Sequence, residues 1–379
     1  MNHSLISTDS IEVLIDEIDK TIKNSFMPTL AFIYVSIEHD IEHLVTKLSK
    51  YKFIVVGSST AGEIYGDDTL GVHAKEGSLT CMLIDMDASA LSIKLKRNKE
   101  NKFFDLGKGI GKWLNKTFSN ASLLTITAGL DFDNESYLKG IQSKHKDIFG
   151  ATAADDRKFK ETYVFSQNKI VKDGLLALAI DKDKIEIVSS QGFGWTGIGI
   201  QRVVTKSKKN IVYTIDDKPA IEFYTEYLNI TSDDMPCMGI DFPMEVISQD
   251  GEVANRAVID INEDGSLLCA GHVKEGSRVK ISIPIGLKVI DNIVESIQET
   301  IDHTDIGTPD LTLLFPCTAH NELFGSLRVK EIEAIFNVTK GKPLIGFYTY
   351  GEFSSYSSSS AFHNETFVTI QMREKNEKT

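Results

Sequence analysis

Hydroxyl and carboxylate side chains recur in three short polar turns, each preceded by an apolar pair and a glycine. The turns read SSTAGE at 58–63, ATAAD at 151–155 and YTYGE at 348–352. These residue types at this spacing suit hydrogen bonding to a polar ligand, general acid–base catalysis, or simple capping of the turn backbone. The candidate ligand-binding residues in the turns are Ser58, Ser59, Thr60, Glu63, Thr152, Asp155, Thr349 and Glu352.

Each turn occupies the same place in a repeated order of elements: an apolar strand, a helix, a second apolar strand, the turn, and a closing strand. The distance from Leu30 to Gly57 is 27 residues, and Leu123 to Gly150 is also 27. Apolar strands followed by helices are typical of sheets buried on both faces. We therefore predict a mixed α/β fold with this internal repeat. Two domains are expected, residues 1–215 with two copies and 216–379 with the third.

The turns are expected to face one pocket, because α/β folds bind ligands beyond the carboxyl ends of their strands. In this hypothesis Thr60 and Glu63 face the same cavity as Thr349 and Glu352. Two alternatives remain open. In the first, the hydroxyls and acids only cap their turns. In the second, the protein is an enzyme in which Glu63, Asp155 or Glu352 acts as acid or base, which requires a raised pKa in a cleft.

Histidine and cysteine side chains near the third turn add further candidates. Cys317, His320 and His363 are placed there by sequence, and a neutral imidazole is a common metal or haem ligand. His39 and His43 stand four residues apart, but acidic neighbours and the buried face of their helix predict a solvated position. GFGWTG at 192–197 matches GxGxxG, yet strand-like residues follow it, so a dinucleotide site is not expected.

Composition excludes several classes of function. The net charge of −13 argues against binding nucleic acid or anionic lipid, since both need a basic face. No apolar run approaches the length of a membrane span, and the first residues do not form a signal peptide. None of the four cysteines lies in a CxxC pair, which indicates a reduced, cytoplasmic protein.

At the level of motifs, the chain resembles FIST proteins, which carry FIST N and FIST C domains in tandem. The resemblance covers residues 25–372 and rests on VVGSSTAGEI, IFGATAADD, SQGFGWTGIG, the VVT-to-TIDDKPAIEFYTEYL segment, LLFPC and GFYTYGEF with FHNET. It implies a sensory protein that binds a small ligand. It also implies a signalling partner in trans, either a histidine kinase or a cyclic-di-GMP enzyme (diguanylate cyclase or phosphodiesterase).

The resemblance to stand-alone FIST proteins of the NosP type implies haem b, with nitric oxide as the signal, as the first ligand candidate. An amino-acid-like metabolite is the second, because hydroxyl- and carboxylate-rich turns suit an amine. His363 matches the HN-x-T block of the family and is the first candidate for a haem axial ligand. His320 is the next candidate, standing where such chains often have Arg in a C-x-x-R pattern. A scaffold with purely structural turns is a third, weaker alternative.

Overall fold

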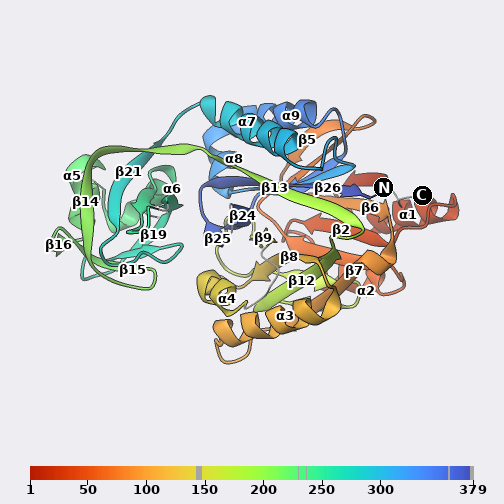
Figure 1. Ribbon diagram of the computed structural model, residues 1–379, viewed down its shortest axis with the longest axis horizontal. Helices are drawn as coiled ribbons and strands as arrows, with labels where there is room; N and C mark the ends of the chain where they lie inside the picture. Colours follow the sequence, from red (N-terminus) through yellow and green to blue (C-terminus); the bar gives the residue numbers. More distant parts are fainter. Residues whose placement is uncertain (142–146, 229, 236, 252, 357–358, 376–379) are drawn as a thin grey trace.

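Three six-stranded sheets form the body of the molecule, and an eight-stranded sheet forms a smaller lobe (Figure 1). The structure is a computed structural model and describes residues 1–141, 147–228, 230–235, 237–251, 253–356 and 359–375. The mixed α/β fold with two domain-like parts and helix-covered sheets is as predicted. In the described ranges, no helix has the length and apolar character needed to cross a membrane.

Each body sheet is built around two parallel strands from one copy of the repeat. The first sheet has the order β1 (Asn2–Thr8), β6 (Leu79–Asp85), β2 (Leu30–Val35), β3 (Ile54–Ser59), β10 (Val164–Ser166) and β11 (Lys169–Val171). The second has the order β25 (Ser359–His363), β24 (Glu352–Tyr356), β9 (Ile148–Thr152), β8 (Ala121–Ala128), β12 (Gly174–Asp181) and β7 (Leu91–Arg97). The third has the order β13 (Ile185–Phe193), β26 (Thr366–Glu374), β22 (Leu311–Pro316), β23 (Leu344–Phe347), β4 (Glu63–Asp67) and β5 (Gly71–Lys75).

The copies exchange hairpins in a cycle. The hairpin β4–β5, which follows the first turn, pairs with β23 in the third sheet. The hairpin β10–β11 of the second copy pairs with β3 in the first sheet. The hairpin β24–β25 of the third copy pairs with β9 in the second sheet. The three polar turns therefore lie where the chain crosses from one sheet to the next.

The inner faces of the three sheets share one apolar core. Phe32 and Tyr34 come from the first sheet, Leu124 from the second, and Phe315 and Phe347 from the third. The ring centroids of Tyr34 and Phe347 lie 4.7 Å apart. Burial on both faces explains why these strands are apolar throughout instead of alternating.

Helices cover the outer face of each sheet (Figure 1). The pairs, one for each sheet in order, are α1 (Ile11–Lys23) with α2 (Ile41–Leu48), α3 (Phe103–Thr117) with α4 (Asn134–Gly140), and α7 (Lys288–His303) with α9 (Arg328–Val338). In α1 the inward residues Leu14 and Ile18 are fully buried, as the sequence period predicts. Its N-cap is Ser10, whose side chain accepts a hydrogen bond from Val13 N.

The lobe consists of residues 195–284, inserted between β13 and α7. Its sheet has the order β18 (Val253–Arg256), β17 (Met244–Ile247), β21 (Arg278–Pro284), β14 (Trp195–Lys208), β15 (Ile211–Ile215), β20 (Leu267–Cys269) and β19 (Val258–Ile261), with β16 (Lys218–Pro219) beside β15. It also carries α5 (Ile221–Leu228) and α6 (Cys237–Asp241). The expected domain division at residues 215/216 falls inside this lobe, between β15 and β16.

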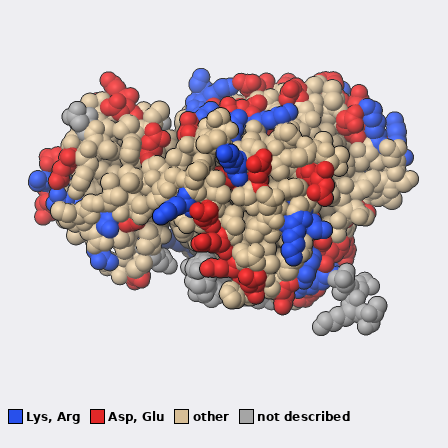
Figure 2. Space-filling model, turned by 90° about the horizontal axis from the view of Figure 1, so that it is seen from above, with Lys and Arg blue, Asp and Glu red and all other residues tan. Residues whose placement is uncertain are grey.

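The molecular surface is hollowed between the lobe and the body, and Lys/Arg and Asp/Glu side chains are interspersed over the face in view (Figure 2). That face carries no broad basic area, in keeping with the net charge of −13.

Two local features differ from expectation. The strand β1, which pairs with β6, was not predicted, because its residues alternate only weakly. The serine-rich segment 354–360 was predicted as a loop, but residues 354–356 and 359–360 belong to β24 and β25. Residues 357 and 358 lie outside the described residues, and so do 376–379 at the charged C-terminal end. The sequence also predicts a helix over residues 136–145, of which 142–145 lie outside the described residues.

Candidate functional site

Main-chain hydrogen bonds join the three polar turns to one another. The bonds are Ala61 N to Tyr348 O (3.0 Å), Tyr348 N to Gly62 O (2.9 Å), Ala154 N to Ser59 O (3.1 Å) and Thr152 N to Gly351 O (2.7 Å). The cyclic exchange of hairpins thus brings together residues some 290 positions apart in sequence. The side chains of the turns, however, have different surroundings in the three copies.

In the first turn the carboxylate is fully hydrogen-bonded. Glu63 is buried and accepts bonds from the Thr60 hydroxyl, from Ser78 N (3.0 Å) and from the Ser78 hydroxyl (2.7 Å). Burial raises its pKa to about 8, against the effect of these donors. The neighbouring Ser58 and Ser59 hydroxyls donate to backbone carbonyls. This turn has the geometry of a structural cap.

In the second turn the carboxylate is also fully engaged. Asp155 accepts bonds from the main-chain N–H groups of Phe159 (2.9 Å), Lys160 (2.6 Å) and Glu161 (2.9 Å), and from the Tyr350 hydroxyl. Thr152 accepts a bond from Asn134 at 3.3 Å. Asp155 therefore holds the loop that follows it and has no free oxygen for a ligand.

In the third turn the same Thr-x-x-Glu pair leaves one oxygen free. The Thr349 hydroxyl donates to Glu352 Oε1 at 2.6 Å, as Thr60 does to Glu63. Glu352 Oε2 is buried and has no hydrogen-bond partner. The difference has a local cause, because Thr366 stands where the first copy has Ser78. The Thr366 hydroxyl donates to Asn364 O (3.1 Å), and only the main-chain N–H of Thr366 acts on the carboxyl group of Glu352.

Three further buried side chains beside Glu352 also have a polar atom without a partner. They are Nδ1 of His363, Oδ1 of Asn364 and Oε2 of Glu365, on side chains exposed by 7%, 2% and 1%. We call Glu352, His363, Asn364 and Glu365 the junction cluster. Glu352 and His363 are direct cross-strand neighbours in β24 and β25.

The unpartnered atoms of the junction cluster are costly. An unsatisfied buried polar group costs about 1–3 kcal/mol, and the whole stability of a domain is about 5–15 kcal/mol. Four such groups in one place consume a large part of that stability. A bound molecule that supplies hydrogen-bond donors would recover it, which makes the junction cluster the best candidate site in the described structure.

The protonation states of the cluster follow from burial. Burial raises the pKa of Glu352 and of Glu365 well above the ordinary range. The Glu365 charge adds to the rise at Glu352, and the Asp241 charge adds to the rise at Glu365. Burial also raises the pKa of the Cys317 thiol, which hydrogen-bonds to Glu365. Burial is the main cause that lowers the pKa of His363 to about 3, and the positive charge of the nearby Arg256 adds to it. The imidazole is therefore neutral. Without a ligand, protonated carboxyl groups are the favoured state.

His320 lies beside the cluster in α8 (Thr318–Phe324) and is fully buried. Its Nδ1 is 2.9 Å from Glu331 Oε1, and its Nε2 has no partner. The ring packs edge-on against Trp195 and Phe367, with centroids 5.3 and 5.6 Å away. A carboxylate that orients an imidazole in this way is typical of metal-binding histidines.

The lobe closes the junction cluster from one side. Asp241 of α6 acts electrostatically on Glu365, and Trp195 Nε1 donates to Asp241 O at 3.2 Å. Trp195 also packs on Cys317 in a small apolar group. The lobe residue Asn255 forms an isolated β-bridge with Asn364. The cluster therefore lies at the contact between the lobe and the body.

An ion cluster fastens the lobe to α4 of the body. Arg256 Nη2 lies 3.1 Å from Glu135 Oε1, and His272 lies 3.1 Å from Glu135 and 3.2 Å from Asp133. Lys209 Nζ lies 2.9 Å from Asp133. Burial raises the pKa of Asp133, but the bonds from His272, Ser136 and Lys209 together hold it well below the usual range.

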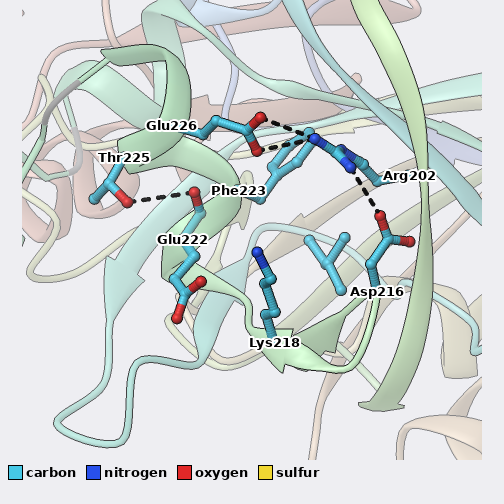
Figure 3. A pocket seen from close by; sticks show the side chains of 8 residues that line it. Arg202, Asp216, Lys218, Glu222, Phe223, Thr225 and Glu226 are labelled. Carbon is cyan, nitrogen blue, oxygen red and sulfur yellow. Dashed lines mark hydrogen bonds and ion pairs between the residues drawn. The ribbon is translucent and has the colours of Figure 1, made fainter.

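Two cavities lie away from the turns. The first, about 330 Å³, opens on the lobe, where Arg202 pairs with Glu226 (2.9 Å) and Asp216 (3.3 Å) (Figure 3). The second, about 350 Å³, is lined by residues around His39 and Lys160. Neither cavity is bordered by a candidate residue of the three turns, so neither provides the cleft that the enzyme hypothesis requires.

The remaining motifs are structural. His39 Nε2 lies 3.0 Å from Gly77 O and His43 Nε2 lies 3.0 Å from Glu12 Oε1, so each has its own partner. In the ranges that the structure covers, no three His, Cys, Asp or Glu side chains are grouped to hold a metal ion. GFGWTG spans the end of β13 and the start of β14. A strand follows the motif where a dinucleotide site needs a helix, as predicted.

Sequence reasoning missed Asn364, Glu365, Asp241 and Glu331. Asn364 and Glu365 stand beside His363 in the FHNET block, so their position was visible, but nothing indicated that their polar atoms lack partners. Glu365 has a φ of 58°, which places it in the left-handed region. Asp241 and Glu331 carry no sequence signal, because only the fold brings them to the cluster.

Two family models match the chain one after the other. The FIST N domain model matches residues 29–218, and the FIST C domain model matches residues 220–355. An uncharacterized protein of Methanocaldococcus jannaschii is 25% identical over 183 residues, which are 46% of this chain. The chain spans about a third (35%) of the length of that relative. With both domain models matched in tandem, the chain belongs to the FIST family.

Proposed function

We propose that this chain is a sensor that binds a small amine-bearing metabolite at the junction cluster and passes its bound state to a separate signalling protein. FIST domains are small-ligand-sensing signalling domains, sensory rather than catalytic. The observation that carries the proposal is the pair of buried carboxyl groups, Glu352 and Glu365, each with one unpartnered oxygen. A protonated amine offers three donors and a positive charge to such a pair.

The lobe provides a physical route from ligand to output. A ligand between Glu352 and Glu365 of the body and Asp241 of the lobe touches both parts of the molecule and favours their closed arrangement. A ligand shifts a conformational equilibrium only through its different affinity for the two states. We propose that a histidine kinase, or a diguanylate cyclase or phosphodiesterase, distinguishes the closed lobe from the open one.

The binding proposal is tested by thermal unfolding of the purified protein with a panel of amines and amino acids. We expect one or more amines to raise the Tm of the wild type, and Glu352→Gln and Glu365→Gln to abolish the shift. Glu63→Gln is the matched control, because it alters the same Thr-x-x-Glu pair where the carboxylate has all its partners. Equal shifts in Glu352→Gln and in wild type would contradict the proposal.

Haem b, with nitric oxide as signal, is the second candidate, favoured by the unpartnered Nδ1 of His363 and Nε2 of His320. The Glu331 contact suits His320 to iron, and either imidazole would supply the axial ligand. A porphyrin also needs a flat apolar slot, whereas His363 lies among carboxyl and amide groups. The residues therefore fit a haem ligand less well than an amine.

Haem binding is tested by the absorption spectrum after haem is added to the purified protein. The haem candidate requires a Soret shift that disappears in His363→Ala or in His320→Ala. A spectrum equal to that of free haem in all three proteins eliminates it and leaves the amine proposal untouched.

A further inference from the structure

The unpartnered atoms of the junction cluster are all able to accept hydrogen bonds. They are carboxyl oxygens of Glu352 and Glu365, the amide oxygen of Asn364 and a ring nitrogen of His363. Thr318 Oγ1, next to Cys317, is also without a partner and accepts as well as donates. Once Glu352 and Glu365 ionise, the site has an excess of acceptors, which an incoming molecule must match with donors.

Three main-chain donors near the cluster are already in use. Cys317 N donates to Thr366 O at 2.9 Å, Thr318 N donates to Thr349 O at 2.9 Å, and His320 N donates to Cys317 O at 3.0 Å. These three N–H groups are therefore not available to an anionic group of a ligand.

The nearest cation, Arg256, is also committed. Its Nε donates to His272 O (3.2 Å), its Nη1 donates to Asn255 O (3.0 Å) and Phe362 O (3.4 Å), and its Nη2 bonds to Glu135 (3.1 Å). Rotating it toward a ligand would break its bonds to Glu135 and to three carbonyl groups. His320 is likewise paired with Glu331 and enclosed by aromatic rings.

We infer that the ligand of this site is an organic cation that carries no carboxylate, such as an alkylamine or an alkylguanidine. The inference rests on the proposed function and narrows its ligand. An α-amino acid would bring its carboxylate against Glu352, Glu365 and Asp241, where Arg256 is committed to other partners. The guanidinium or ammonium group of a decarboxylated amino acid meets the acceptors and adds no negative charge.

The test compares matched pairs of probes by thermal shift and calorimetry on the full-length protein: agmatine with L-arginine, and cadaverine with L-lysine. We expect the amine of at least one pair to bind at least about tenfold more tightly than its amino acid. Binding should be lost in Glu352→Gln and kept in Glu63→Gln, whose circular dichroism spectra report folding.

The outcomes distinguish a wrong ligand class from a wrong binding site. If an amino acid binds as tightly as its amine, and binding still depends on Glu352, the inference is overturned while the proposed function stands. If no probe binds the wild type, or if binding is unchanged in Glu352→Gln, the proposed function fails and the inference fails with it.

Discussion

Glu63 and Glu352 show how the same residue motif serves two purposes. Both are buried, and both accept a hydrogen bond from the threonine three positions earlier. The Ser78 hydroxyl completes the shell of Glu63, whereas Thr366 turns its hydroxyl to Asn364 O. One hydroxyl group therefore separates a structural cap from a carboxyl group with a free oxygen. We regard this difference as the strongest residue-level argument for the site.

The raised pKa of Glu365 makes stability depend on pH. A buried acid with a raised pKa stabilises the fold fully below its ordinary pKa, near 4.5, and loses that contribution as pH rises through the raised value. Glu365→Gln keeps the shape without the charge. We expect its free energy of unfolding to exceed that of ligand-free wild type by roughly 1–3 kcal/mol at pH 8, and to equal it near pH 4.5. Urea unfolding at the two pH values measures this, and a variant equally destabilised at both would contradict it.

Ligand binding should release protons from the same carboxyl groups, Glu352 and Glu365. A cation binds the ionised carboxylates, so binding releases the protons that burial retains in the free protein. The affinity for an amine that binds is expected to rise with pH above about 5, by up to about tenfold per pH unit for each proton released. Calorimetry in buffers of different ionisation enthalpy counts the protons. A pH-independent affinity with no proton release would be inconsistent with this site.

At the scale of elements, the recurring glycine before each turn has a steric reason. An added Cβ would lie 2.1 Å from the Phe165 ring at Gly57, 1.8 Å from Thr125 O at Gly150, and 2.0 Å from Leu314 O at Gly346. Gly150 also has a φ of 139°, which side chains rarely adopt. The glycine permits close approach at the edge where the chain crosses between sheets, which explains its presence in all three copies.

Gly150→Ala is therefore expected to destabilise the body by roughly 3–5 kcal/mol or to prevent folding. Gly109→Ala is the control, because Gly109 lies in α3 with nothing within 4 Å of the added methyl group. That change should stabilise the helix by roughly 0.5–1 kcal/mol. Guanidinium unfolding compares the two, and a Gly150→Ala protein as stable as wild type would refute the steric explanation.

Across the whole molecule, the sequence predicted what is local and repeated, but not what the chain joins over long distances. The apolar strands, the amphipathic helices and the three turns followed from periodicity and from the spacing of Gly57 and Gly150. The cyclic hairpin exchange did not, because strands such as β4 pair with a copy almost 280 residues away and carry no sign of that partner. For the same reason, the sequence indicated Glu352 and His363 but not their neighbour Asp241 in the lobe.

The ion cluster at α4 should control how firmly the lobe is docked. Removing Arg256 takes the arginine partner from Glu135, which keeps only its His272 contacts, a change worth up to roughly 3–5 kcal/mol. We expect Arg256→Ala to increase proteolysis in the segments that join lobe and body, and to weaken ligand binding. Arg202→Ala, which removes a more exposed ion pair within the lobe, should change little, about 0–1 kcal/mol. Equal protease sensitivity of the two variants would show that this contact does not hold the lobe.

The most direct test of the central claim is to identify what remains bound to the protein after gentle purification, by native mass spectrometry together with an absorption spectrum. We predict a small organic cation without a carboxylate, bound to wild type and to Glu63→Gln and missing from Glu352→Gln. A Soret band with stoichiometric haem, or a bound anionic molecule that survives in Glu352→Gln, would contradict the account.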